Sequence, residues 1–275
     1  MSTTAQELAL IDEAAASIRE RLGAIPPVLV VAGSGLGGFA ATLTNTRSAS
    51  YNELRHFPVS TVVGHAGKLV VGEAGGKSVV VMNGRKHLYE GVDPKVAVLP
   101  LRALMRCGVK TVILSNAAGC VNPRFSTGEM MLITDHVNNM ARNPLIGGNI
   151  NELGPRFPDM SEPYSRRLQK LALSTAGELG IVLREGVYIA NLGPTFETQA
   201  EVMMFRMMGD AVGMSTVPET IVAVHAGAEV LGISLLTNSH VERTAAVTTH
   251  DEVIEVGRHA TERFNRLITA ILGRL

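Results

Sequence analysis

The sequence predicts a single α/β domain in which a central mixed β-sheet is flanked by helices. Short, continuous apolar segments, typical of strands buried on both faces, alternate along the chain with segments of helical period. No low-complexity tract, linker or internal repeat divides residues 1–275, so we expect one domain over this whole range. In such a fold, functional residues are expected in loops at the ends of strands.

The composition argues against several classes of protein. Twenty-five basic residues balance 25 acidic ones, whereas binding nucleic acid through a broad field needs surplus positive charge. No apolar run reaches the roughly 18 residues of a membrane helix, and residues 1–11 lack the pattern of a secretory signal. Cys107 and Cys120 fit neither a disulfide framework nor a metal site. We therefore expect a soluble cytoplasmic protein with no nucleic-acid or membrane partner.

The first elements follow from the spacing of apolar residues. These recur at three- and four-residue steps from Leu8 to Leu22, which predicts a helix that ends at Gly23. Residues 28–31 are a β-branched run and predict a buried strand, which ends at a cluster of glycines.

A hairpin and a helix are predicted next. Residues 69–72 and 78–82 flank Gly75-Gly76, the pattern of two strands joined by a tight turn. Asp93 is a suitable cap for a helix that closes at Gly108.

The rest of the chain continues the alternation. Apolar runs predict strands over residues 111–114, 130–134, 187–190 and 232–236. Helical patterns cover residues 165–179, 198–208, 218–230 and 251–272, and Thr249 with Glu252 resembles a capping box for the last of them.

The glycine-rich segment after the first strand has more than one interpretation. Residues 33–38, GSGLGG, satisfy the dinucleotide fingerprint G-x-G-x-x-G, and Glu53 lies about twenty residues beyond. The same glycines, with the Ser34 hydroxyl, suit a single phosphate equally well. Residues 39–45 predict no long helix that would hold a pyrophosphate, and a purely structural turn remains possible.

A second candidate segment, residues 83–91, combines basic and aromatic side chains. Arg85, His87 and Tyr89 share one face of an extended chain and offer a planar fork, a second donor and a hydroxyl that could reach a sugar. A solvated surface loop is the alternative. His65, bracketed by glycines in residues 64–67, is a supporting candidate for the same anion.

Four further loops are expected at strand ends. Residues 115–119, SNAAG, suit either ligand contact through backbone amides or close helix packing. Residues 193–198 place Phe196 beside Glu197, which would suit a purine or complement a helix dipole. Residues 213–219 contain Ser215 and Thr216, of which one is explained by helix capping. Asn238 follows the strand over residues 232–236 and can donate and accept together.

These segments together resemble the trimeric purine nucleoside phosphorylases, from about Val28 to the last helix. The matching motifs, in order, are GSGLG at Gly33, GHAG at Gly64, GRKHLYEG at Gly84, SNAAG at Ser115, GPTFET at Gly193, VGMSTVPE at Val212 and SLLTN at Ser234. Seven motifs in the same order are far more specific than any one of them.

The resemblance implies roles for individual residues. Catalysis is assigned to His87, Glu197 and Asn238. Phosphate would be bound by Ser34, His65, Arg85, His87, Ala117 and Ser215; the purine by Ala117, Phe196, Glu197, Met214 and Asn238; and the ribose by Tyr89, Phe157, Met214 and His250. Phe157 would be lent to a neighbouring subunit's site, which implies a homotrimer. No metal or organic cofactor is implied, because phosphate itself is the nucleophile and a co-substrate.

The implied activity is the reversible phosphorolysis of 6-oxopurine ribonucleosides or deoxyribonucleosides, inosine and guanosine, through an oxocarbenium-like transition state. A methylthioadenosine phosphorylase, which typically carries Asp in place of Asn238, and a xanthosine-accepting phosphorylase are the alternatives within the fold. A dinucleotide-dependent oxidoreductase and a silent nucleoside-binding protein are alternatives of other classes. Cys120 replaces a usual glycine, and the segment 239–249 departs from the family, which leaves His240 as a second candidate for the role of His250.

Overall fold

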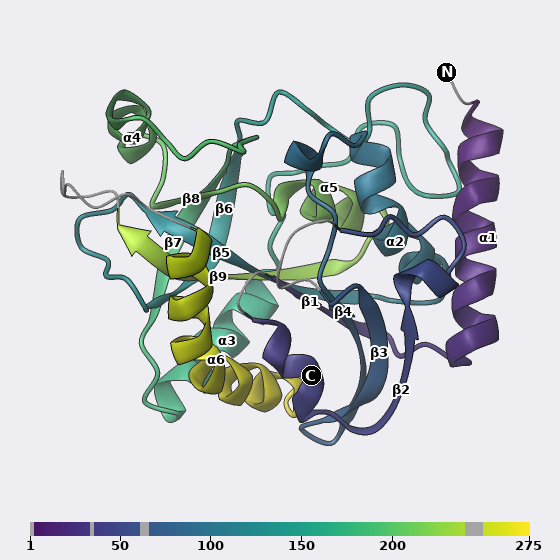
Figure 1. Ribbon diagram of the computed structural model, residues 1–275, viewed down its shortest axis with the longest axis horizontal. Coiled ribbons are helices and arrows are strands. Elements are labelled where there is room, and N and C mark those ends of the chain that lie inside the picture. Colours follow the sequence, from purple (N-terminus) through teal and green to yellow (C-terminus); the bar gives the residue numbers. More distant parts are fainter. Residues whose placement is uncertain (1–2, 34–35, 61–65, 240–249) are drawn as a thin grey trace.

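One mixed sheet organises the protein (Figure 1). The computed structural model describes residues 3–33, 36–60, 66–239 and 250–275, and within them nine strands and six α-helices are found. The strands are β1 (Val28–Ala32), β2 (Thr44–Ser50), β3 (Lys68–Ala74), β4 (Lys77–Asn83), β5 (Thr111–Cys120), β6 (Met130–Asn138), β7 (Leu183–Ala190), β8 (Ala211–Gly213) and β9 (Glu229–Ser239). The α-helices are α1 (Thr4–Leu22), α2 (Pro94–Arg106), α3 (Arg166–Glu178), α4 (Gln199–Arg206), α5 (Val217–His225) and α6 (His250–Leu272).

Alternation along the central strand β1 builds a hydrophobic core on each face of the sheet. Leu29 and Val31 pack into a cluster that contains the apolar faces of α1, α2 and α5. Val28, Val30 and Ala32 point the other way, into a cluster that α3 and α6 complete. The two groups of helices lie on opposite sides of the sheet in Figure 1. The predicted architecture, a central mixed sheet flanked by helices, is therefore confirmed.

The second half of the sheet closes on itself. The strand order is β2-β3-β4-β1-β5-β8-β7-β6-β9, and β9 also pairs in parallel with β5. Strands β5, β8, β7, β6 and β9 consequently form a ring, in which β8 is antiparallel to β5 and β9 is antiparallel to β6. This ring gathers the ends of β5, β7, β8 and β9 into one region.

Predicted caps and turns are found where the sequence places them. The Asp93 carboxylate accepts a hydrogen bond of 2.8 Å from the Lys95 backbone N–H at the start of α2. Ser165 and Thr198 cap α3 and α4 in the same way. In the hairpin β3–β4, Gly75 and Gly76 have φ angles of +58° and +73°, which only glycine adopts without strain. Cys107 and Cys120 are both free thiols.

Several predicted boundaries are wrong, and tertiary pairing explains them. Residues 115–119, predicted as a loop, continue β5, because β9 pairs with this strand as far as Cys120. Residues 237–239 likewise belong to β9. The helix predicted over residues 218–230 ends at His225, since Glu229 already begins β9. The unpredicted strand β2 is mostly exposed, so it lacks the apolar run on which the prediction depended.

Two further observations complete the fold. A short 3₁₀ helix, Gly37–Thr42, follows the glycine cluster, in agreement with the prediction that no long helix begins there. Thr249, the expected cap of α6, lies outside the described residues. Among the helices that the structure describes, none combines the length and apolarity that crossing a membrane requires.

Candidate functional site

Strand registers bring the candidate segments to one place. Gly119 of β5 pairs with Val212 of β8 on one side and with Asn238 of β9 on the other. Ala190, the last residue of β7, pairs with Gly213 of β8. The segments that follow β7 and β8 therefore begin beside the end of β5, although they are far apart in the sequence.

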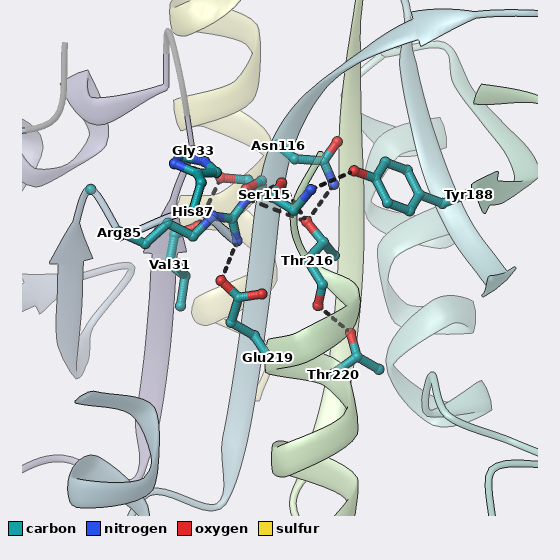
Figure 2. Close-up of polar contacts among 12 residues, drawn as sticks. Val31, Gly33, Arg85, His87, Ser115, Asn116, Tyr188, Thr216, Glu219 and Thr220 are labelled. Carbon is teal, nitrogen blue, oxygen red and sulfur yellow. Dashed lines mark hydrogen bonds and ion pairs between the residues drawn. The ribbon is translucent and has the colours of Figure 1, made fainter. Parts of the chain in front are cut away.

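Arg85, which follows β4, is the central charged residue of this region. Its side chain is only 3% exposed. The Nη2 group donates to the Ser215 Oγ atom at 2.7 Å and to the Ser115 carbonyl oxygen at 3.0 Å. Figure 2 shows the guanidinium between Ser115, in the middle of β5, and Glu219. Arg85 and Ser215, which the resemblance gives as two of the phosphate ligands, are thus in direct contact.

Glu219 is the countercharge of Arg85, and sequence reasoning missed it. Its Oε1 atom lies 3.4 Å from Arg85 Nη1, and both side chains are almost fully buried. Glu219 lies in the first turn of α5, where the helix dipole also favours a carboxylate. A signal was present in the sequence: Glu219 is the acidic residue of α5, an otherwise largely apolar helix that the fold buries.

Thr216 is the N-cap residue of α5, but its hydroxyl does not cap the helix, contrary to the expectation that capping accounts for Ser215 or Thr216. Instead, Thr216 Oγ1 accepts hydrogen bonds from Asn116 Nδ2 at 2.8 Å and from Arg85 Nη2 at 3.3 Å (Figure 2). Its backbone has a φ angle of +70°, which is unfavourable for a β-branched residue. The Thr216 side chain therefore binds Asn116 and Arg85 although its backbone conformation is unfavourable.

The glycine cluster packs directly against β5 at Ser115. The Gly33 N–H donates to Ser115 Oγ at 3.1 Å, and Ser115 Oγ donates to the Val31 carbonyl at 2.9 Å. A Cβ atom on Gly33 would lie 2.5 Å from the Ser115 carbonyl oxygen, so only glycine fits. Glu53, the acidic residue of the dinucleotide interpretation, instead caps its own turn by accepting from the Ser50 N–H at 2.8 Å.

His87 lies beside Arg85 and is held by Glu90. The Glu90 Oε1 atom accepts from the His87 backbone N–H at 2.8 Å and lies 3.5 Å from His87 Nδ1. Lys86 Nζ pairs with Glu90 Oε2 at 2.8 Å. Burial lowers the pKa of His87, against the opposing effect of the Glu90 hydrogen bond, so the ring is neutral at pH 7. Glu90 is a second residue that the sequence analysis missed, although it stands three positions after His87.

Tyr89 and Met214 flank this group. The Tyr89 ring stacks on His87, with centroids 4.8 Å apart, so the two side chains do share a face as predicted. Burial raises the pKa of Tyr89 to about 12, which keeps its hydroxyl protonated. Met214 and Ser215 line one small cavity together with His87. Gly193 has a φ angle of +68°, and a Cβ atom there would lie 2.3 Å from Met214 Sδ.

The expected purine-binding residues follow β7 and end β9. Glu197 Oε1 accepts from Asn191 Nδ2 at 3.4 Å, and the Asn191 N–H donates to the Gly213 carbonyl at 2.8 Å. Asn238 Oδ1 accepts from Thr237 Oγ1 at 3.1 Å. Phe196 is partly exposed. These contacts connect Glu197, through Asn191, to Gly213 at the end of β8.

The remaining expected residues are placed differently. Ala117 is half-buried within β5, where it pairs with Leu235. Phe157 is 86% exposed, in the loop that precedes α3, with Arg156 over its ring at 5.3 Å. Ser34, His65 and His240 lie outside the described residues, and His250 begins α6 with its side chain outside the description.

Tyr188 of β7 is a further residue that sequence reasoning did not single out. Its hydroxyl accepts a hydrogen bond from the Ser215 backbone N–H at 3.3 Å. Burial raises the pKa of Tyr188 to about 12, so the hydroxyl remains neutral beside Arg85. A tyrosine inside an otherwise apolar strand was the available signal, because a buried phenol needs a polar partner.

This arrangement suits a small anion next to a flat, partly polar ligand. A buried guanidinium and the Ser215 and Thr216 hydroxyls supply donors for an oxyanion. Within the described residues, no group of three or more His, Cys, Asp or Glu side chains is arranged to hold a metal ion.

Comparisons with known proteins identify the family to which this chain is similar. The model of the phosphorylase superfamily matches residues 27–273. Purine nucleoside phosphorylase 1 of Geobacillus stearothermophilus is 49% identical over 266 residues, which cover 96% of this chain and 97% of that protein. Two purine nucleoside phosphorylase structures from Schistosoma mansoni each superpose with a TM-score of 0.92. The complex with inosine is 34% identical and covers 98% and 97% of the two chains; the complex with adenosine is 36% identical and covers 96% of each.

Proposed function

Because this chain belongs to the phosphorylase superfamily, and within it to the purine nucleoside phosphorylases, which are pentosyltransferases, we propose that its substrates are 6-oxopurine nucleosides. Inosine and guanosine, as ribosides or deoxyribosides, would react reversibly with phosphate to give the free base and the pentose 1-phosphate. The observation that carries this proposal is the buried Arg85–Ser215 contact beside His87, in one region with Glu197 and Asn238.

Phosphate is assigned to the Arg85 side of the site. Arg85 presents a planar fork to two oxygens, and Ser215 adds a hydroxyl donor at 2.7 Å from Nη2. A neutral His87 donates one N–H without adding positive charge, in keeping with its lowered pKa. Ser34, His65 and the Ala117 backbone are proposed as the further donors. Glu219 balances the guanidinium charge, so that the site remains stable without a bound anion.

The base is assigned to Glu197, Asn238 and Phe196. A 6-oxopurine carries an N1–H donor, for which a carboxylate such as Glu197 is a suitable acceptor, whereas adenine has no hydrogen there. The Asn238 amide can donate to N7 and the neighbouring 6-oxygen. Thr237 donates to Asn238 Oδ1, which orients the amide so that its NH₂ group is available to the base. Phe196 and Met214 would supply apolar contact for the ring.

Phosphate itself attacks the sugar in the proposed reaction, so no activated serine or cysteine is required. As the glycosidic bond breaks, positive charge develops on the sugar and negative charge on the departing purine. Asn238 and Glu197 stabilise the base more strongly as electrons arrive, and the bound phosphate stabilises the cationic sugar. His87, fixed by Glu90, holds a phosphate oxygen on the attacking side. Tyr89, Met214 and His250 are proposed to contact the ribose, with His240 as the alternative to His250.

A homotrimer is part of the proposal. Phe157 is 86% exposed, which is unusual for a large aromatic side chain, and it lies in the loop that precedes α3. It would complete the ribose side of a neighbouring subunit's site. No metal or organic cofactor takes part, since phosphate is both nucleophile and co-substrate.

The experiment is chromatography of inosine, guanosine, xanthosine and adenosine incubated with the purified protein, with and without inorganic phosphate. Phosphate-dependent release of hypoxanthine and guanine, with ribose 1-phosphate and little adenine, is expected. Base release without phosphate would mean hydrolysis and would overturn the assignment of the phosphate site. Preferential cleavage of adenosine or methylthioadenosine would overturn the base assignment alone. Preferential cleavage of xanthosine would replace inosine and guanosine with xanthosine as the proposed substrate.

A further inference from the structure

A second charged pocket lies away from the phosphorylase site. It is a cavity of about 10 Å³ between α1, α2, α5 and residues 144–150. Glu7 from α1, Lys95 and Arg102 from α2, and His225 from the end of α5 line it, together with Asn149. Three helices and one long loop therefore converge on a space about the size of one water molecule or a monatomic ion.

Arg102 carries one buried donor for which the described part of the chain supplies no acceptor. The side chain is 6% exposed, and its Nε atom is fully buried with no hydrogen-bond partner among the described residues. In the same part of the chain, no carboxylate oxygen lies within 4.0 Å of the guanidinium. Leaving a buried guanidinium N–H without an acceptor is costly.

The charges around the pocket do not balance. Glu7 is the acidic residue of the lining, and its Oε2 atom lies 2.7 Å from Lys95 Nζ. Burial lowers the pKa of Arg102, and the more distant Glu7 charge only partly opposes this effect. His225 adds no charge at pH 7, because burial and the Arg102 charge both lower its pKa. One carboxylate thus faces two cations, which leaves one positive charge in excess.

We propose that the Arg102 pocket binds a small monovalent inorganic anion of the size of chloride. The Arg102 N–H groups would hold it, and its charge would complete the balance with Lys95 and Glu7. Phosphate or a carboxylic acid is too large for a cavity of about 10 Å³. The bound anion joins α1, α2 and α5 to the loop that leads to Phe157, so it stabilises the fold without entering the reaction.

The direct test is a crystal of the full chain grown without chloride and soaked in sodium bromide, with data collected on both sides of the bromine absorption edge. We expect an anomalous peak in contact with the Arg102 guanidinium. The same experiment on Arg102→Met should lose the peak. Arg106→Met is the matched control, because Arg106 lies one turn further along α2 and pairs at the surface with Asp12 at 2.8 Å; it should keep the peak.

Thermal unfolding in solution gives an independent readout. Sodium chloride, compared with sodium gluconate at equal ionic strength, should raise the Tm of the wild type and of Arg106→Met by several degrees, with saturation. Arg102→Met should show no chloride-specific shift and should retain its phosphorylase activity. An ordered water without an anomalous peak in the wild type, or a peak that survives in Arg102→Met, would overturn the proposal. The wild-type crystal decides even if Arg102→Met fails to fold.

Discussion

Arg85 and Glu219 form a buried ion pair, with Nη1 and Oε1 3.4 Å apart, between the first turn of α5 and the middle of β5. Taking two charges out of water is unfavourable unless each satisfies the other. The same guanidinium donates through Nη2 to the Ser215 hydroxyl, and both residues are proposed to bind the phosphate. Stability and anion binding are consequently coupled through one side chain.

Replacing Glu219 by alanine tests this coupling. We expect the variant to lose about 3–5 kcal/mol of unfolding free energy, because Arg85 is left buried without its countercharge. Phosphate should partly restore the lost stability by supplying negative charge beside the guanidinium. Urea unfolding of both proteins with and without phosphate measures the effect. A stability gap that phosphate leaves unchanged would contradict the proposed position of the anion.

Arg85→Lys keeps the positive charge but loses the planar pair of guanidinium donor groups. A single ammonium group cannot contact Glu219, the Ser115 carbonyl and Ser215 together as the two Nη groups do. We expect kcat/KM for phosphate to fall roughly ten- to hundred-fold, the equivalent of losing one charge-assisted hydrogen bond. Phosphate saturation at fixed inosine measures it, with Arg55→Lys, a surface pair with Glu20, as the control.

Thr216 offers a matched pair of substitutions. Thr216→Ala removes the hydroxyl that accepts from Asn116 but keeps a Cβ atom at a φ angle of +70°. Thr216→Gly removes the same hydroxyl and also relieves the backbone strain. Glycine should therefore be more stable than alanine here by about 1 kcal/mol, the reverse of the order in a helix interior. Chemical unfolding measures the unfolding free energy of each variant. Equal free energies for the alanine and glycine variants would show that the backbone at this position is not strained.

Asn238→Asp should move base preference toward adenosine. The aspartate accepts but does not donate, which suits a 6-amino group and repels a 6-oxygen. We expect the ratio of kcat/KM for inosine to that for adenosine to fall by roughly ten- to a hundred-fold. Steady-state assays with both nucleosides measure the ratio. An unchanged ratio would remove Asn238 from the base site.

Stability should fall as the pH drops from 7 toward 5.5. His87, His136 and His225 all have pKa values that burial lowers below the ordinary value of 6.5. The unfolded chain therefore takes up protons in this window while the folded chain does not, and the unfolding free energy decreases by up to about 1.4 kcal/mol per pH unit for each histidine. Unfolding titrations at pH 7.5 and 5.5 test the sign. His136→Phe should reduce the dependence of the unfolding free energy on pH. An unchanged dependence would show that His136 does not contribute to it.

The sequence by itself determined the elements and the list of candidates. Continuous apolar runs, helical periodicity and caps such as Asp93 are local, because each depends on neighbours a few residues away. Arg85 and Ser215 were expected to act together, and they are in contact.

Only the tertiary structure decided how far the strands run and which groups pair. Residues 115–119 form a strand because β9 lies beside them, and Glu219 reaches Arg85 because the first turn of α5 lies beside the middle of β5. Thr216, expected to share the capping of α5 with Ser215, serves Asn116 and Arg85 instead. The partner of a buried polar group is chosen by sheet register and helix placement, which bring distant residues together and which local spacing does not encode.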